Sequence, residues 1–218
     1  MAKFAGDKKK GQSIFGPLEK KLVEKYVDKV PKWLETYHLT FLTIPWCVLI
    51  VLGGYLAQDN LSWLWLVSVM IVFQYVTDLF DGAVGRHRNT GLVKWGYYMD
   101  HLLDYFFLCS ILICYAFVVL FEFSYYLFFI LAILGGFMVN SFLSFSATNQ
   151  FQISHMGIGP TEIRIVFIII NTLFIIFGKT YLFFTLPFCL AATFGGLVYV
   201  IYLNHKEIWA IDMKNKHR

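Results

Sequence analysis

Six long apolar segments dominate the chain and limit it to one class of fold. Short polar connections separate them, and each reaches the length that a helix needs to cross about 30 Å of hydrocarbon, the fifth only marginally. Of 218 residues, 58% are hydrophobic and 15% are charged, which is too apolar for a water-soluble domain. The sequence therefore predicts an all-α polytopic membrane protein. The segments are residues 39–57, 61–81, 97–121, 125–145, 162–177 and 181–203.

The region before the first apolar segment is basic and amphipathic. After a short lysine-rich tail, Gly16 and Pro17 open a predicted helix in which apolar residues recur at helical spacing with lysines between them. This pattern favours a helix on an anionic membrane surface over a solvated helix packed on other connections. We thus divide the chain into residues 1–38 (tail and interfacial helix), 39–204 (six-helix transmembrane domain) and 205–218 (basic tail).

The positions of the positive charges predict how the chain is oriented. Of the eighteen Lys and Arg residues, only Lys179 falls in a connection on the side opposite the termini. The other seventeen lie in the N-terminal region, the second-to-third connection, the start of the fifth segment or the C-terminal tail. The positive-inside rule then places both termini in the cytosol.

Nothing in the sequence indicates nucleic-acid binding or a cleavable signal peptide. The four cysteines lie in apolar segments without metal-ligand spacing, as expected of packing thiols.

Four carboxylates lie at the cytosolic ends of two of these segments. Asp78 and Asp81 are three residues apart, and Asp100 and Asp104 are four apart, so each pair shares one face of a helix. Carboxylates at the edge of hydrocarbon are costly, which indicates a function. A purely structural alternative is that Asp78 and Asp81 pair with Arg86 and Arg88 and cap helices at the interface. Two divalent cations, Mg²⁺ or Mn²⁺, would neutralise all four charges through oxygen ligands.

The spacing of these residues resembles a known motif. Residues 78–104 contain Asp78-x2-Asp81-Gly82-x2-Gly85-Arg86, then Gly96-x3-Asp100-x3-Asp104. This resembles DxxDGxxAR-x8/9-GxxxDxxxD, the motif of the CDP-alcohol phosphotransferase (CDP-alcohol phosphatidyltransferase) family. The match covers four aspartates, two glycines and one arginine. Gly85 departs from it, because the family usually has alanine there.

The resemblance implies an enzyme of phospholipid biosynthesis with six membrane helices around a polar cavity open to the cytosol, and a homodimer in many members. Its members use two divalent metals to hold the pyrophosphate of a CDP-linked donor. An acceptor hydroxyl attacks the β-phosphorus and CMP is released. By position, the metal ligands are Asp78, Asp81, Asp100 and Asp104, with Asp104 also a candidate general base. Gly82, Gly85 and Arg86 fall where the family cradles the CMP portion.

Further similarities favour one branch of the family. Asp100-His101 is similar to the FDHGCD segment of choline and ethanolamine phosphotransferases, although Leu102-Leu103 replaces its Gly-Cys. Residues 30–33 are similar to their VPxW segment, and residues 159–162 to another of their segments. In place of their PNxxT stretch, residues 36–40 keep only the final threonine. The donor is therefore expected to be CDP-choline or CDP-ethanolamine and the acceptor a diacylglycerol-like lipid, with His101 or Glu162 as candidate catalytic bases.

Two alternatives remain open. In the first, the chain transfers a phosphatidyl group from CDP-diacylglycerol to a polar alcohol such as inositol phosphate, glycerol phosphate or serine. A second phosphate would then need a basic pocket, for which Arg88, Lys94, His155 and Arg164 are candidates. In the second, the aspartates carry a divalent cation across the membrane. The clustering of the aspartates near one membrane face disfavours transport, because transport sites usually lie near the midplane.

Overall fold

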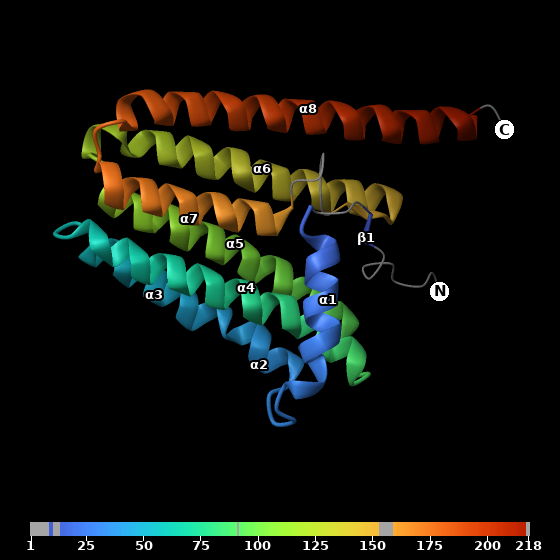
Figure 1. Cartoon of the computed structure of the whole chain (residues 1–218). Coiled ribbons are helices and arrows are strands. Elements are labelled where there is room, and N and C mark those ends of the chain that lie inside the picture. The colour runs from blue at the N-terminus through green and yellow to red at the C-terminus, as the bar shows by residue number, and fades with distance from the viewer. Residues whose placement is uncertain (1–8, 11–13, 91, 153–158, 217–218) are drawn as a thin grey trace.

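The computed structural model describes residues 9–10, 14–90, 92–152 and 159–216, and within these it is almost entirely helical (Figure 1). Among the described residues, six helical segments are long and apolar enough to cross a membrane, which confirms the predicted fold class. The helices are α1 (Gly16–Tyr26), α2 (Thr36–Phe41), α3 (Thr43–Leu56), α4 (Leu64–His87), α5 (Val93–Val118), α6 (Ser124–Thr148), α7 (Pro160–Phe177) and α8 (Leu182–Lys216). A two-residue parallel pairing joins β1 (Lys9–Lys10) to β2 (Phe151–Gln152).

Several helices extend beyond the apolar segments that predict them. Helix α5 begins at Val93, four residues before the predicted start, and α8 continues as one helix to Lys216. Residues 205–216 are therefore helical, because no proline or glycine follows the last span to end it. The predicted interfacial helix is shorter than its apolar pattern: α1 ends at Tyr26 and a 3₁₀ turn, Val27–Lys29, follows.

Helices α3, α4 and α5 form the most tightly packed part of the bundle. Its centre holds fully buried side chains such as Ile50, Val67 and Ile111. Gly54 allows α3 to approach α5 closely, since a β-carbon there would lie 2.5 Å from the Cα atom of Cys114. Close approach through small residues is the usual way in which membrane helices gain packing energy. This packed centre positions the C-terminal end of α4 relative to the N-terminal end of α5.

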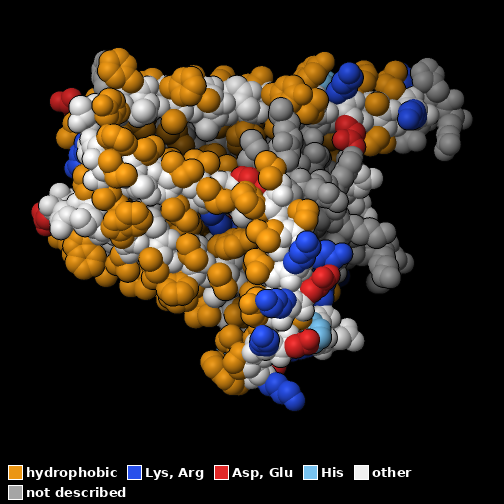
Figure 2. Space-filling view, in the orientation of Figure 1, with side chains coloured by type: hydrophobic (Ala, Val, Ile, Leu, Met, Phe, Trp, Pro, Cys, Tyr) orange, Lys and Arg blue, Asp and Glu red, His pale blue; other side chains and the backbone are white. Residues whose placement is uncertain are grey.

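Basic and apolar side chains separate clearly on the surface (Figure 2). Lys and Arg gather over α1 and the adjoining end of the bundle, and apolar side chains cover the sides of the helices. The exposed apolar residues include Val48, Phe128 and Phe188, as expected where hydrocarbon replaces water as the solvent. The structure thus describes an integral multi-pass membrane protein with one basic end.

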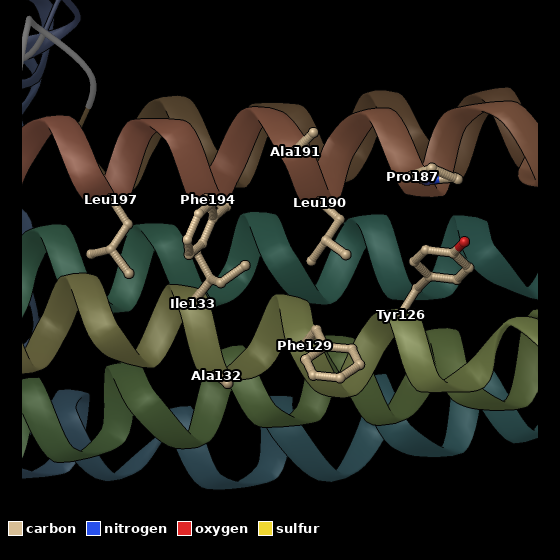
Figure 3. A pocket seen from close by; sticks show the side chains of 9 residues that line it. All are labelled: Tyr126, Phe129, Ala132, Ile133, Pro187, Leu190, Ala191, Phe194 and Leu197. Carbon is tan, nitrogen blue, oxygen red and sulfur yellow. The ribbon is translucent and has the colours of Figure 1, made fainter.

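An apolar cavity of about 500 Å³ lies between α6 and α8 (Figure 3). Aromatic and aliphatic side chains such as Phe129, Pro187 and Phe194 line it, and the hydroxyl of Tyr126 is its most polar group. None of its lining residues is charged, and none belongs to the carboxylate motif. The chemistry expected from the sequence must therefore be sought at the basic end of α4, α5 and α7.

Candidate active site

Three of the four predicted metal ligands converge where the C-terminal end of α4 meets the N-terminal end of α5. Asp78, Asp100 and Asp104 each offer one carboxylate oxygen, and these oxygens all lie within 4.8 Å of one another. Each of these three residues is partly buried. Carboxylate oxygens at this separation suit a hard cation such as Mg²⁺ or Mn²⁺, so the donor set fits the metal implied by the motif.

Asp81, the fourth predicted ligand, is held by a residue of α2. It is 7% exposed, and its Oδ2 atom lies 2.9 Å from the hydroxyl oxygen of Thr40. The same hydroxyl lies 3.0 Å from the carbonyl oxygen of Thr36, so its single proton has two acceptors, of which the carboxylate is the stronger. Thr40 is the one residue retained from the PNxxT pattern, but sequence reasoning assigned it no role. Its contact with Asp81 is visible only in the tertiary structure.

Arg164 of α7 lies among the aspartates. Its Nη2 atom is 3.0 Å from Asp78 Oδ2 and 3.2 Å from Asp104 Oδ1, and its Nε atom donates a hydrogen bond to Gln74 Oε1 at 2.8 Å. The side chain is 6% exposed and lies near the Phe107 ring. From the sequence, Arg164 was a candidate for a phosphate-binding pocket or one of the positive charges that orient the chain in the membrane. Its contact with the aspartates was not predicted. A single arginine inside the fifth apolar segment was the only signal.

His101 follows Asp100 directly on α5 and is partly buried. Its Nδ1 atom is 2.7 Å from the carbonyl oxygen of Tyr97 and 3.5 Å from Asp100 Oδ2. A carbonyl oxygen only accepts hydrogen bonds, so Nδ1 carries the proton and the neutral ring has its lone pair on Nε2. The ring also packs on Tyr97 and Phe142.

Glu162 has backbone partners at the start of α7. Its Oε2 accepts a hydrogen bond from the Gly159 amide at 2.7 Å, and its Oε1 accepts one from the Phe15 amide at 3.4 Å. These contacts cap the first turn of α7 and join it to the residue that precedes α1. Glu19 of α1 adds a second connection, because its carboxylate accepts hydrogen bonds from the hydroxyls of Tyr75 and Thr161. Helix α1 thus crosses the ends of α4 and α7, as Figure 1 shows.

The predicted CMP-binding residues lie on the last turns of α4. The exposed guanidinium of Arg86 lies over Gly82, where a β-carbon would be 3.2 Å from Arg86 Nη1. At Gly85 a β-carbon would lie 3.0 Å from Thr36 Oγ1. The surface of this turn therefore consists of backbone and the long cationic side chain of Arg86. This arrangement suits the binding of a phosphate group.

The other candidates for a second phosphate pocket have different surroundings. Arg88 donates hydrogen bonds to the carbonyl oxygens of Val30, Pro31 and Leu34, at 2.9, 3.1 and 2.8 Å, and thereby fixes the turn that precedes α2. Lys94 is exposed at the start of α5. His155 lies outside the described residues.

Comparison with known proteins identifies the family. No curated protein matches the chain. The profile of one family, described as CDP-alcohol phosphatidyltransferase, matches residues 30–201, which include all four aspartates of the motif. This match agrees with the six-helix fold and with the convergence of the aspartates at one end of the bundle. The chain therefore belongs to the CDP-alcohol phosphatidyltransferase family, and it is a transferase of phosphate-containing groups.

Proposed function

We propose that this membrane enzyme transfers the phospho-alcohol group of CDP-choline or CDP-ethanolamine to the hydroxyl of a diacylglycerol, with release of CMP, and that Mg²⁺ or Mn²⁺ supports the reaction. Family membership gives the reaction class, phospholipid-type transfer from a CDP-alcohol. The observation that carries the proposal is the convergence of Asp78, Asp100 and Asp104, with one oxygen each within 4.8 Å of the others. We further propose that the enzyme works as a homodimer with its active site facing the cytosol.

Asp78, Asp81, Asp100 and Asp104 would hold two divalent cations. When bound, such cations polarise phosphoryl oxygens and stabilise the charge that develops on the leaving group. The protein's own contribution is to position these carboxylate ligands. Thr40 holds one oxygen of Asp81 towards α2 and so fixes the orientation of this carboxylate. Arg86, exposed beside Gly82, would bind a phosphate oxygen of the CMP portion.

His101 is our candidate for the general base. Tyr97 fixes its tautomer, so Nε2 is the atom that would take the proton from the acceptor hydroxyl. The hydroxyl oxygen then forms a bond to the β-phosphorus, and the bond from that phosphorus to the bridging oxygen breaks as CMP leaves. In this structure Asp104 pairs with Arg164, and Glu162 accepts hydrogen bonds from two backbone amides. The contact with Tyr97 orients the His101 ring, and this orientation supports His101 over either carboxylate.

The surroundings of Arg88 and Arg164, the two arginines among the pocket candidates, favour an aminoalcohol donor over CDP-diacylglycerol. Transfer to a phosphorylated polar alcohol would need cationic side chains to bind its phosphate. Arg88 is bound to three carbonyl oxygens and Arg164 to two aspartates, so neither guanidinium faces outward as a pocket would require. The adjacent aspartate and histidine at 100–101 remain the main support for the choline or ethanolamine branch.

The deciding experiment measures CMP release by the purified protein with Mg²⁺ or Mn²⁺. One reaction contains CDP-choline or CDP-ethanolamine with diacylglycerol, and the other contains CDP-diacylglycerol with a panel of polar alcohols. We expect CMP from the first reaction and none from the second. CMP from the second alone would overturn the donor assignment. Metal uptake into proteoliposomes without CMP release in either reaction would overturn the enzyme assignment in favour of transport.

A further inference from the structure

The carboxylate cluster contains its own cation. Among the described residues, the ion pairs made by Asp78 and Asp104 both involve the Nη2 atom of Arg164. Arg164 is 5% exposed as a whole residue and lies in the first turns of the apolar fifth span, Pro160–Phe177. An arginine this deeply buried needs ionic partners, and carboxylates this close together need a cation.

We propose that Arg164 is a built-in counter-ion that neutralises Asp78 and Asp104 in the metal-free enzyme and competes with the divalent cation for them. The inference rests on the metal dependence in the proposed function and extends it to a residue outside the motif. Arg164 is then a positioning residue whose charge sets the affinity for metal.

The competition follows from the geometry. A divalent cation bound by Asp78 and Asp104 would lie about 2.0–2.6 Å from their oxygens. The guanidinium nitrogen is 3.0 and 3.2 Å from oxygens of the same two carboxylates. Two positive groups would thus be within a few ångströms of each other in a poorly solvated site, where their repulsion is strong. Either the guanidinium withdraws or the metal binds more weakly.

Helix α4 provides a tether for the withdrawn side chain. The Nε atom of Arg164 donates to Gln74 Oε1 at 2.8 Å, and Gln74 is 1% exposed. The guanidinium also lies 5.6 Å from the Phe107 ring and 5.9 Å from the Tyr75 ring. These contacts do not involve the aspartates, so they favour a position of the guanidinium close to the site even when its bonds to the carboxylates weaken. The charge therefore stays beside the site in both states.

The test compares R164Q with the wild type by Mn²⁺ binding, measured by titration calorimetry on purified protein, and by thermal unfolding with and without Mn²⁺. K206Q is the matched control, because it removes one positive charge from an exposed position on α8, outside every candidate site. R164K is measured in parallel, because it retains a charge and provides a folded variant if R164Q cannot be purified.

We expect R164Q to bind Mn²⁺ about tenfold more tightly than the wild type, because the competing charge is gone. Metal-free R164Q should melt at a lower temperature than the wild type, and Mn²⁺ should restore most of the difference. R164K should fall between the two in affinity, because an ammonium cannot reproduce all the bonds of the guanidinium. K206Q should behave as the wild type.

Weaker or unchanged Mn²⁺ binding by R164Q and R164K would overturn the inference, and so would a loss of stability that Mn²⁺ does not reduce. Those results would leave the proposed function intact, provided that the wild type binds Mn²⁺. If neither the wild type nor any variant binds Mn²⁺ or Mg²⁺, the metal dependence in the proposed function fails first, and the inference fails with it.

Discussion

Thr36 and Gly85 pack directly against each other: a β-carbon built on Gly85 would lie 3.0 Å from the hydroxyl oxygen of Thr36 and 3.4 Å from its methyl carbon. These are also two positions at which the sequence departs from the patterns that it resembles, with threonine in place of the proline of PNxxT and glycine in place of alanine. Because these two residues are in contact, the absence of a side chain at Gly85 leaves room for the side chain of Thr36. One turn away, Thr40 and Asp81 join the same two helices.

We predict that G85A depends on the residue at 36. Alanine stabilises a helix by roughly 0.5–1 kcal/mol relative to glycine, but here its methyl group would crowd Thr36. G85A should therefore lower the melting temperature in the wild-type background and raise it in a T36A background. Thermal unfolding in detergent of the four proteins of this double-mutant cycle measures the coupling. Equal effects of G85A in both backgrounds would show that the contact has no energetic consequence.

The aspartates should be essential for turnover but not for folding. D81N and D100N each remove the charge of a proposed oxygen ligand, so we expect each to abolish metal-dependent CMP release and to leave the protein folded and inserted. D59N is the matched control, since Asp59 is exposed in the turn between α3 and α4. Full activity in either site variant would rule out that residue as a ligand.

Loss of the Thr40 hydroxyl should act through Asp81. T40V keeps the shape of the side chain but removes the donor 2.9 Å from Asp81 Oδ2. We expect the Mg²⁺ concentration for half-maximal activity to rise about tenfold, as is typical when a residue that orients a metal ligand is lost. T40S should retain most of the wild-type behaviour because it keeps the hydroxyl. A T40V enzyme with unchanged metal dependence would contradict a role in placing Asp81.

Replacement of His101 should affect proton transfer and leave metal binding unchanged. We expect H101A to lower kcat by about 10²–10⁴-fold, the usual contribution of a general base, with unchanged affinity for Mn²⁺. H205A is the control, because His205 is exposed on α8. If E162Q reduces kcat this far and H101A does not, Glu162 is the base. A severe loss in H101A, in an enzyme shown to use CDP-diacylglycerol, would break the link between His101 and the aminoalcohol branch.

The sequence alone determined the class of fold, the spans and the motif. Apolar segments long enough to cross a bilayer have few alternatives to a helix, because unpaired backbone groups are too costly in hydrocarbon. Helical geometry is likewise local. The i,i+4 spacing of Asp100 and Asp104 therefore predicts, without any knowledge of packing, that both lie on one face of α5. The family profile over residues 30–201 confirmed what the motif predicted.

The tertiary structure alone decided which residues surround the aspartates. Arg164 is 86 residues from Asp78 in the chain, and Thr40 is 41 residues from Asp81. Their contacts depend on how α7 and α2 pack on α4. The spacing of residues within one helix does not determine how that helix is rotated or shifted along its axis relative to its neighbour. The same packing joins Thr36 to Gly85 and leaves Glu162 bonded to backbone amides. Helical periodicity is a local property that a sequence displays, whereas the register between helices is set by side-chain fit across the whole bundle.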